Sequence, residues 1–274
     1  MRAYDITAKI QDLRHLDWAE RSQTSGTSGM FLKAREGQGT SATYYKLSCY
    51  DSYRGIFGHE CVNELVAARL MGLLGIEHVR YQLVHALVCV DGREYETRLA
   101  RSRSYRHSTE RKQALDVFYR LRRLADERPL DFCDRMGWSL QIRRMMLADY
   151  LIANRDRHGA NIEVLCGSDG VCRLAPLFDN GLSFVFSCYG DQGRIARFDV
   201  MDDMVANNFV GTKSLEENLA FLQGFELGVN PFDESWEVPL FQGLEGVISE
   251  VHRDAMWRMI KERWQRYALL SDNR

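Results

Sequence analysis

Two short segments in the middle of the chain contain the side chains that phosphoryl transfer requires. Residues 154–161 read Asn-Arg-Asp-Arg-His-Gly-Ala-Asn, and residues 174–181 read Leu-Ala-Pro-Leu-Phe-Asp-Asn-Gly. Moving a γ-phosphoryl group needs a carboxylate that receives the proton of the acceptor hydroxyl, and oxygen ligands that hold magnesium against the nucleotide phosphates. We predict that Asp156 is the general base and that Asn161 and Asp179 bind the metal.

The spacing of these residues carries more weight than any one of them. Asp and Asn are common in turns, so each alone could serve only to cap a loop. The pattern Arg-Asp-x-x-x-x-Asn over residues 155–161 is the spacing of protein-kinase catalytic loops, and Asp179 follows an apolar, strand-like run. Arg157 and His158 have no partner at metal-ligand spacing, so we expect them to position the loop and contact nucleotide, whereas Asn180 is expected to be structural.

A kinase site also needs a lysine that pairs with the α- and β-phosphates and a helical carboxylate that fixes this lysine. Lys46 lies in a strand-like run, and Glu60 and Glu64 lie one turn apart on the helix expected next. We assign Glu64 to the pair, because it lies within the apolar stripe, whereas a carboxylate near a helix start often only complements the helix dipole. Lysine in an edge strand is commonly a surface residue, but the downstream motif favours a catalytic Lys46.

Residues 24–29, Thr-Ser-Gly-Thr-Ser-Gly, could lay backbone N–H groups against phosphate oxygens, since glycine has no Cβ. Most loops of this composition are plain surface turns. The chain has no Gly-Lys-Ser/Thr signature, which excludes a Walker-type site in its usual form. The order of Gly-rich loop, strand, turn and lysine-bearing strand nevertheless favours a loop that covers the triphosphate.

Composition restricts the other classes of function. The chain has 274 residues, of which 45% are apolar and 27% charged, and its net charge of −2 gives no global attraction to nucleic acid or anionic membrane. Its seven cysteines are scattered without a C-x-x-C pair, which predicts reduced thiols rather than a zinc site or a disulfide framework. No apolar run approaches a membrane span and residues 1–18 lack a signal-peptide core, so we expect a soluble, cytoplasmic protein.

The pattern of elements predicts an α+β, bilobal, protein-kinase-like fold. Strands are expected over residues 30–34, 43–47, 81–90 and 94–99, with Asp91-Gly92 as a type I′ hairpin turn. Helices are expected over residues 58–74, 109–128, 139–153 and 245–270, and from a capping box at Ser214 to Glu217. We therefore predict a small β-rich N-terminal lobe with one helix, residues 1–102, and a larger, mainly helical C-terminal lobe, residues 103–274.

Residues 98–123 are rich in Arg and Lys and could contact an acidic peptide or nucleic acid. Interspersed acidic residues and the lack of aromatic interleaving favour a solvated helix face instead, so direct nucleic-acid binding is not expected.

With these motifs in hand, the chain resembles the HipA-like serine/threonine kinases, whose catalytic segment has the form Asn-x-Asp-Arg-His-x-x-Asn and whose metal aspartate follows in Leu-Ala-Pro-x-x-Asp. Both forms are present, and the Gly/Ser loop, the Lys46 strand and the Glu64 helix match more loosely. The resemblance implies an ATP- and magnesium-dependent protein kinase with Asp156 as proton acceptor, Asn161 and Asp179 on the metal and Lys46 on phosphate.

The resemblance also implies nucleotide contacts from Ser28, Gly29, Lys33 and His158. Family members phosphorylate a serine of their own loop over ATP; Ser28, with Ser25 as the alternative, is the expected site, and a phosphate there would repel the triphosphate. The implied protein substrate is a component of translation, and an antitoxin or regulator protein is an implied partner. Larger family toxins carry an additional N-terminal subdomain for which this chain has no room, which leaves the antitoxin contact open.

Two other functions share these motifs. A phosphoinositide or small-molecule kinase can carry a similar loop followed by Asp, although the chain shows no interfacial amphipathic helix with a concentrated cationic face. A catalytically silent, kinase-like scaffold is the second alternative, and the joint retention of Lys46, Asp156, Asn161 and Asp179 argues against it.

Overall fold

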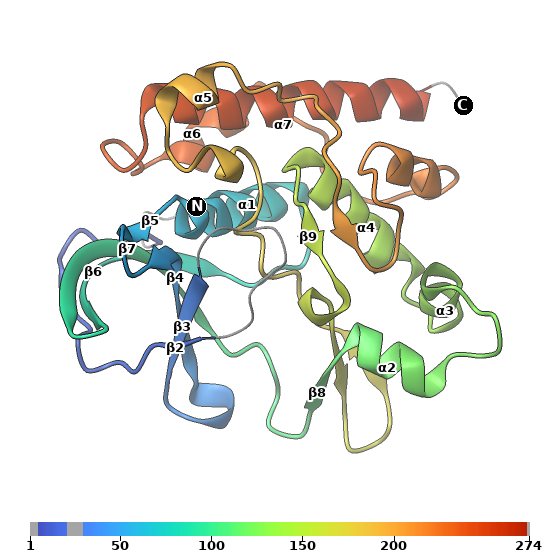
Figure 1. Cartoon of the computed structure of the whole chain (residues 1–274). Coiled ribbons are helices and arrows are strands. Elements are labelled where there is room, and N and C mark those ends of the chain that lie inside the picture. The colour runs from blue at the N-terminus through green and yellow to red at the C-terminus, as the bar shows by residue number, and fades with distance from the viewer. Residues whose placement is uncertain (1–4, 21–29, 273–274) are drawn as a thin grey trace.

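The computed structural model describes residues 5–20 and 30–272, and the chain up to Arg103 builds a seven-stranded sheet (Figure 1). Its strands are β1 (Gln11–Asp12), β2 (Ala19–Glu20), β3 (Met30–Glu36), β4 (Thr43–Asp51), β5 (Gly55–Phe57), β6 (Tyr81–Val90) and β7 (Arg93–Arg103). They follow the order β1-β6-β7-β4-β3-β2, and β5 pairs with β4. All four strands predicted from the sequence are present, and each extends to or slightly beyond its predicted bounds.

Side chains alternate across β3 and β4, and this alternation gives the sheet two different faces. Leu32, Tyr45 and Leu47 are buried on one face, in an apolar cluster with the segment before β2. Lys33 and Lys46 are register partners on the two strands and belong to the opposite face. The sheet therefore presents a pair of neighbouring lysines to the rest of the molecule.

Local chemistry explains the hairpin and the helix of this lobe. Asp91 and Gly92 both have positive φ, 50° and 75°, as a type I′ turn requires, and they join β6 to β7 as predicted. Helix α1 (Glu60–Leu74) ends at Gly75, whose left-handed backbone lets it close the helix with hydrogen bonds to Gly72 and Met71. The predicted helix and its stop are confirmed.

The second part of the chain is mainly helical. Its helices are α2 (Leu115–Arg122), α3 (Pro129–Arg135), α4 (Ser139–Leu151), α5 (Gln192–Ala196), α6 (Glu237–Phe241) and α7 (Glu250–Asp272). Short strands accompany them: β8 (Arg111–Ala114), β10 (Glu163–Cys166) and β11 (Cys172–Leu174) form one sheet, and β9 (Asp156–Arg157) pairs with β12 (Asn207–Asn208). The expected α+β arrangement, with a β-rich first part and a mainly helical second part, is confirmed.

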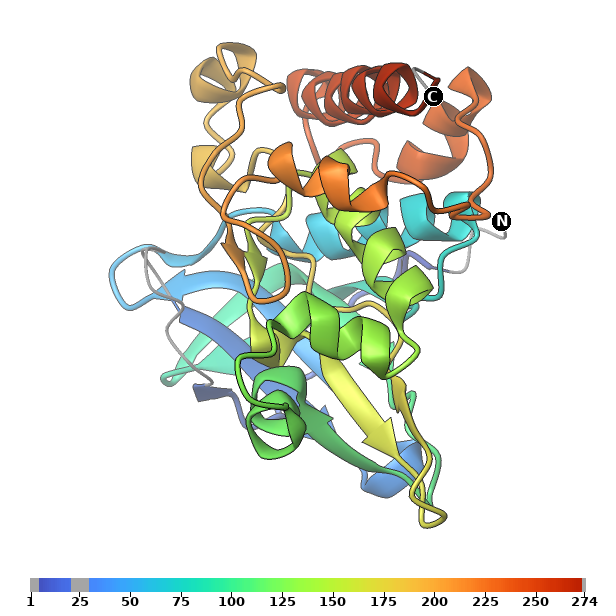
Figure 2. The same cartoon turned by 90° about the vertical axis from the view of Figure 1, so that its right-hand side faces the viewer.

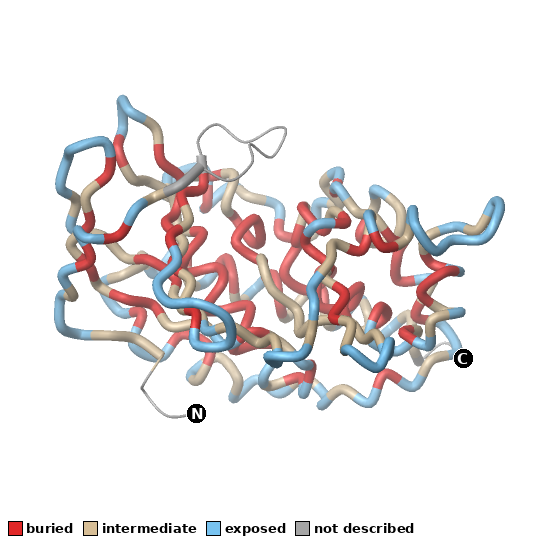
Figure 3. Tube along the Cα trace, turned by 90° about the horizontal axis from the view of Figure 1, so that it is seen from below, coloured by how far each residue is buried: buried red, intermediate tan, exposed pale blue. Residues whose placement is uncertain are grey.

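One large apolar core joins α1 to the helices of the second part, with α4 at its centre. In two perpendicular views α7 lies along the top edge of the molecule, with α1 between it and the large sheet (Figures 1 and 2). Buried residues line the interior of both parts, and the exposed segments are mostly peripheral loops (Figure 3). The boundary at residue 102 stays a prediction, because this core crosses it. In the described part of the chain, no helix has both the length and the apolar character of a membrane span.

The predicted helix over residues 109–128 is wrong in its first third and in its length. Residues 111–114 form β8, because they pair with β10 in an antiparallel ladder. Only α2 is helical, and it ends when Arg123 adopts an extended backbone with ψ of 149°. Tertiary strand pairing thus overrides the local pattern.

Two further helix predictions need correction. Ser214 does cap the backbone N–H of Glu217 at 2.9 Å, but the element that follows, Glu217–Leu222, is a 3-10 helix. The last helix starts at Glu250 rather than residue 245, because Gly246 has a φ of 75° and Ser249 caps the helix through the N–H of His252.

The expectation that all cysteines are reduced is wrong for one pair. Cys166 and Cys172 are directly opposite each other on β10 and β11 and form a disulfide. The sequence hides this pair because the hairpin that aligns the two residues is not evident from their spacing. The other five cysteines are free.

Candidate active site

The predicted catalytic loop follows the buried helix α4. Asp156–Arg157 form β9 and pair in parallel with Asn207–Asn208. The side chain of His158 then accepts a backbone N–H of the next 3-10 turn at 3.2 Å. Asn161 closes the loop by donating from Nδ2 to the backbone oxygen of Asp156 at 2.8 Å. These bonds fix Asp156 and Asn161 relative to one another.

Arg157 joins the catalytic loop to its surroundings, and its side chain is only 1% exposed. It pairs with the buried Asp149 of α4 at 2.7 Å. It also donates to the backbone oxygen of Phe178 at 2.7 Å and to Asn180 Oδ1 at 2.6 Å, both beside Asp179. One buried guanidinium therefore ties α4, the catalytic loop and the predicted metal-binding segment together.

The segment around Asp179 has an unusual backbone. Asp179 has a φ of 56°, and Ala153 and Phe184, in the neighbouring loops, have φ of 50° and 56°. Such values are uncommon outside glycine and concentrate where function dictates the local geometry. Asn63 of α1 holds the segment in place, because its Nδ2 donates to the backbone oxygens of residues 181 and 183 at 2.9 and 3.0 Å.

Both lysines of the sheet bind the carboxylate of Asp179. Lys33 Nζ lies 3.1 Å from Oδ2, and Lys46 Nζ donates to Oδ1. Lys46 also donates to Glu64 Oε1 at 2.8 Å, and the other oxygen of Glu64 accepts the backbone N–H of Asn180 at 2.8 Å. Like charges facing each other across a strand pair repel, and the two carboxylates offset this repulsion.

Glu60 occupies a different environment from Glu64, although it is equally buried. Its oxygens accept hydrogen bonds from the backbone N–H and the thiol of Cys49, each at 3.3 Å. Burial raises the pKa of Glu60. The carboxylate that contacts Lys46 is therefore that of Glu64.

The two lysines determine the charge state of Asp179. Burial alone would raise the pKa of this carboxyl group, but the charges of Lys46 and Lys33 outweigh it and hold the pKa well below its ordinary value. Burial would likewise lower the pKa of Lys46, yet the charges of Asp179 and Glu64 raise it well above its ordinary value. Asp179 is therefore a permanent anion at any physiological pH.

Asp156 is in the opposite situation. It is 8% exposed, and burial raises its pKa, an effect that the charge of His158 reduces and that of Asp179 reinforces. Its side-chain contacts are long: Asn207 Nδ2 donates to Oδ1 at 3.3 Å, and His158 Nε2 lies 3.8 Å from Oδ2. A weakly held carboxylate with a raised pKa is suited to accept a proton.

Asn161 and Asp179 offer the ligands that magnesium prefers. The amide nitrogen of Asn161 is committed to the backbone of Asp156, which leaves its oxygen for a cation, and Asp179 supplies an anionic oxygen. Magnesium characteristically takes one or two protein oxygens and completes its shell with water and substrate phosphates. The described residues contain no cluster of three or more His, Cys, Asp or Glu that could hold a metal by itself. This donor set fits a cation that arrives with the nucleotide.

Three of the predicted residues, Ser25, Ser28 and Gly29, lie outside the described residues. Of the others, the structure brings Lys33, Lys46, Glu64 and Asp179 into direct contact, and it connects Asp156 with His158 and Asn161 in one loop.

Sequence reasoning missed several residues that shape the site. Asn207 reaches Asp156 from a strand about fifty residues farther along the chain, and Tyr81 accepts the backbone N–H of Asp179 at 3.3 Å. Asp149 pairs with Arg157. No local motif marks Asn207 or Tyr81, but a lone Asp in the apolar run before the catalytic loop was a usable signal for a buried charge pair.

The basic stretch 98–123 is partly used inside the molecule. Arg98 donates to the backbone oxygen of Thr7, and Arg101 to Gln82 and Gln11. The rest of the stretch includes the exposed face of α2.

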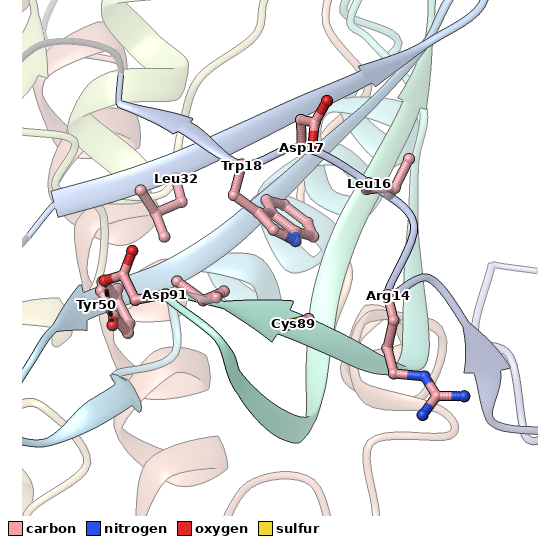
Figure 4. Close-up of a pocket in the computed structure, with 9 residues that line it drawn as sticks. Arg14, Leu16, Asp17, Trp18, Leu32, Tyr50, Cys89 and Asp91 are labelled. Atoms are coloured by element: carbon pink, nitrogen blue, oxygen red, sulfur yellow. Dashed lines mark hydrogen bonds between the residues drawn. The ribbon is translucent and has the colours of Figure 1, made fainter.

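A pocket of about 330 Å³ opens on the outer face of the large sheet (Figure 4). Leu16, Trp18, Leu32, Tyr50 and Asp91 are among its lining residues. None of the predicted catalytic residues lines it, and Leu32 faces away from the lysine pair. It is therefore separate from the candidate active site.

Similarity to solved structures agrees with this geometry. A Helicobacter pylori proinflammatory kinase, CtkA, matches with a TM-score of 0.60 and 14% identity over 94% of this chain and 95% of that chain. The chain has a kinase-like fold. This confirms the fold class predicted from the sequence.

Two weaker similarities accompany it. A HipA structure from Shewanella oneidensis MR-1, in a complex with HipB and operator DNA, matches with a TM-score of 0.48 and 13% identity over 92% of this chain and 66% of that one. A Neurospora crassa PAN3 pseudokinase mutant matches with a TM-score of 0.34 and 11% identity over 96% of this chain and 66% of that one. No protein-family model and no curated protein matches the sequence. At such identities the similarity establishes the kinase-like fold and nothing finer.

Proposed function

We propose that this kinase-like protein is an ATP- and magnesium-dependent protein kinase that phosphorylates serine or threonine hydroxyls. The observation that carries the proposal is the contact of Lys46 with both Glu64 and Asp179, beside an Asp156 whose pKa is shifted in the opposite direction from that of Asp179. Pairs of carboxylates with such divergent environments mark a division between proton transfer and charge stabilisation.

Each residue has a role in the proposed reaction. The acceptor oxygen attacks the γ-phosphorus, the bond from this phosphorus to the β–γ bridging oxygen breaks, and ADP leaves. The proton of the acceptor hydroxyl passes to the carboxylate of Asp156. Lys46, held by Glu64, pairs with the nucleotide phosphates together with Lys33. Asn161 and Asp179 would hold magnesium, which would supply positive charge that neutralises the phosphate oxygens.

The regulation and the target are proposed on the sequence resemblance. Ser28, or Ser25, is the proposed site of autophosphorylation, His158 and Gly29 are proposed nucleotide contacts, and a component of translation is the proposed substrate. An antitoxin-like regulator is the proposed partner. Peptide mapping after incubation with ATP tests the proposed autophosphorylation site, and the absence of phosphate from residues 21–33 would refute it.

The experiment that tests the function is transfer of labelled phosphate from [γ-32P]ATP to proteins of a cell lysate and, separately, to phosphoinositide vesicles. Wild type is compared with Asp156→Asn and with Asp131→Asn, a matched change of an exposed carboxylate. We expect protein bands with wild type and Asp131→Asn and none with Asp156→Asn. Label in lipid alone would identify a lipid kinase, and ATP binding without transfer to any acceptor would identify a scaffold; either outcome overturns the proposal.

A further inference from the structure

A groove of about 540 Å³ lies between α6, the segment 242–249 and the first turn of α7. Its walls include Val238, Phe241, Leu244 and Ile248. Arg69 of α1 fixes α6 in place, because it donates to the backbone oxygen of residue 240 at 2.8 Å. The volume lies in the range of protein pockets that bind ligands. Val238, on the wall of this groove, is 72% exposed.

The rim of this groove is acidic. Glu237, Glu245 and Glu250 line it, and within the described part of the chain none of the three forms an ion pair. Arg253 also lines the groove; it pairs with Asp254 at 3.0 Å, and the charges of Glu237 and Glu250 act on it as well, so the groove keeps a net negative charge. Of the acidic residues nearby along the chain, Glu234 pairs with Lys261 and Glu216 with Arg266, so the acidic charge that carries the argument is that of the three groove residues.

A complementary surface exists on the same chain. Helix α2 exposes Val117 and Leu121, one turn apart, at 36% and 72%, and Leu124 just beyond its end at 59%. Arg122 and Arg123 flank these side chains on the exposed surface. A basic helix with an exposed apolar stripe is the kind of element that binds in an apolar groove with an acidic rim.

The two surfaces lie at opposite ends of the molecule, with α2 at the lower right and α6 at the upper left of Figure 1. One copy therefore cannot fill its own groove. The net charge of −2 is small, so overall repulsion between copies is weak. We infer that the groove receives α2 of a second copy of this chain, in a head-to-tail contact that depends on ionic strength. Such contacts are heterologous and build rings or chains.

Sedimentation velocity over a concentration series, at low and at high salt, tests this inference. Wild type is expected to associate at low salt and to dissociate at high salt. The groove variant Glu237→Lys/Glu245→Lys and the helix variant Arg122→Glu/Arg123→Glu should each lose association more than about tenfold, because like charges then face each other. Mixing the two variants should restore association, since both contacts become complementary again.

The control is Glu217→Lys/Glu226→Lys, which changes the net charge equally at residues that are exposed and do not line the groove. It should associate as wild type does. Leu121→Asn should weaken association without any change in charge. Unaltered melting temperatures show that the variants are folded, since all of these side chains are at the surface.

A wild type that is monomeric at every concentration and salt would overturn the inference. So would equal behaviour of the groove variant and its control, or failure of the mixture to associate. The inference does not depend on the proposed kinase activity, because Asp156→Asn should associate as wild type does; loss of labelled transfer and loss of association are thus separate results.

Discussion

The two loops of the candidate active site hold their aspartates in opposite ways. Asp179 is bound through both oxygens by Lys33 and Lys46, and these charges hold its pKa far below the ordinary value of 3.8. Asp156 has one long hydrogen bond from Asn207, and burial raises its pKa. Within one site, the lysines thus keep Asp179 charged, whereas burial makes the carboxylate of Asp156 a stronger proton acceptor.

This difference shows what each loop contributes. A carboxylate that never takes a proton is a dependable ligand for a cation, whereas a base must be free to change its protonation state during the reaction. Burial acts on both residues, and the lysine pair decides the outcome for Asp179 alone. The register of β3 against β4, which sets the two lysines opposite each other, is therefore as important to the site as the catalytic motifs.

The largest expected effect comes from separating the two loops. Arg157→Met leaves Asp149 buried without its partner, and we expect the free energy of unfolding to fall by about 3–5 kcal/mol. The double variant Arg157→Met/Asp149→Leu should recover much of this loss, because no charge is then left unpaired. Urea unfolding measures both values, and a loss below about 1 kcal/mol for the single variant would show that Arg157 does not hold the loops together.

The variants Asp179→Asn and Asp156→Asn should change the free energy of unfolding in opposite directions. Asp179→Asn removes charged hydrogen bonds from both lysines, so unfolding at pH 7 should become easier by about 1.5–3 kcal/mol. Asp156→Asn removes a buried charge with little compensation and should stabilise the protein on the order of 1 kcal/mol. Thermal or urea unfolding of both variants measures the two signs; equal signs would contradict the comparison.

The pH dependence of these two effects follows from the pKa directions. Asp179 has a lowered pKa in the folded state, so its stabilising contribution is complete above the ordinary value of 3.8 and is lost as pH falls toward the folded value. Asp156 has a raised pKa, so its destabilising charge is present above the folded pKa and disappears as pH falls through it. As pH falls, the stability of Asp179→Asn should therefore approach that of wild type from below, and the stability of Asp156→Asn should approach it from above.

The smallest effect concerns the fine positioning of Asp156. Asn207→Ala removes a donor to the carboxylate, which should raise its pKa and move the acidic limb of kcat/KM to higher pH. A lost hydrogen bond of about 1 kcal/mol corresponds to a decrease in kcat/KM of up to about fivefold at neutral pH. Asn207→Asp should shift the limb further, because it adds a negative charge. Identical pH profiles for wild type, Asn207→Ala and Asn207→Asp would show that Asn207 does not influence the pKa of Asp156.

Local patterns predicted the parts of the fold that depend on local chemistry. The hairpin at Asp91-Gly92 and the helix stop at Gly75 need only their own backbone conformations. The prediction of a helix over residues 109–128 was wrong because residues 111–114 form β8 by pairing with β10. The prediction that all cysteines are reduced was wrong for a related reason, since a hairpin aligns Cys166 with Cys172.

The same distinction applies to the site. Asp156, Asn161 and Asp179 lie in compact motifs, and Lys46 and Glu64 lie in elements whose order along the chain is informative. The contact of Asn207 with Asp156 spans 51 positions and depends on the pairing of β12 with β9. A single sequence holds no local pattern from which such a contact follows.

Magnesium-dependent binding of ATP, measured by calorimetry together with single-turnover phosphoryl transfer, tests the division of roles most directly. We predict that Asp156→Asn binds ATP with magnesium as wild type does, while its transfer rate falls by about 10²–10⁴. Asp179→Asn should lose the magnesium-dependent part of ATP binding. Wild-type transfer by Asp156→Asn, or unchanged magnesium dependence in Asp179→Asn, would contradict the account.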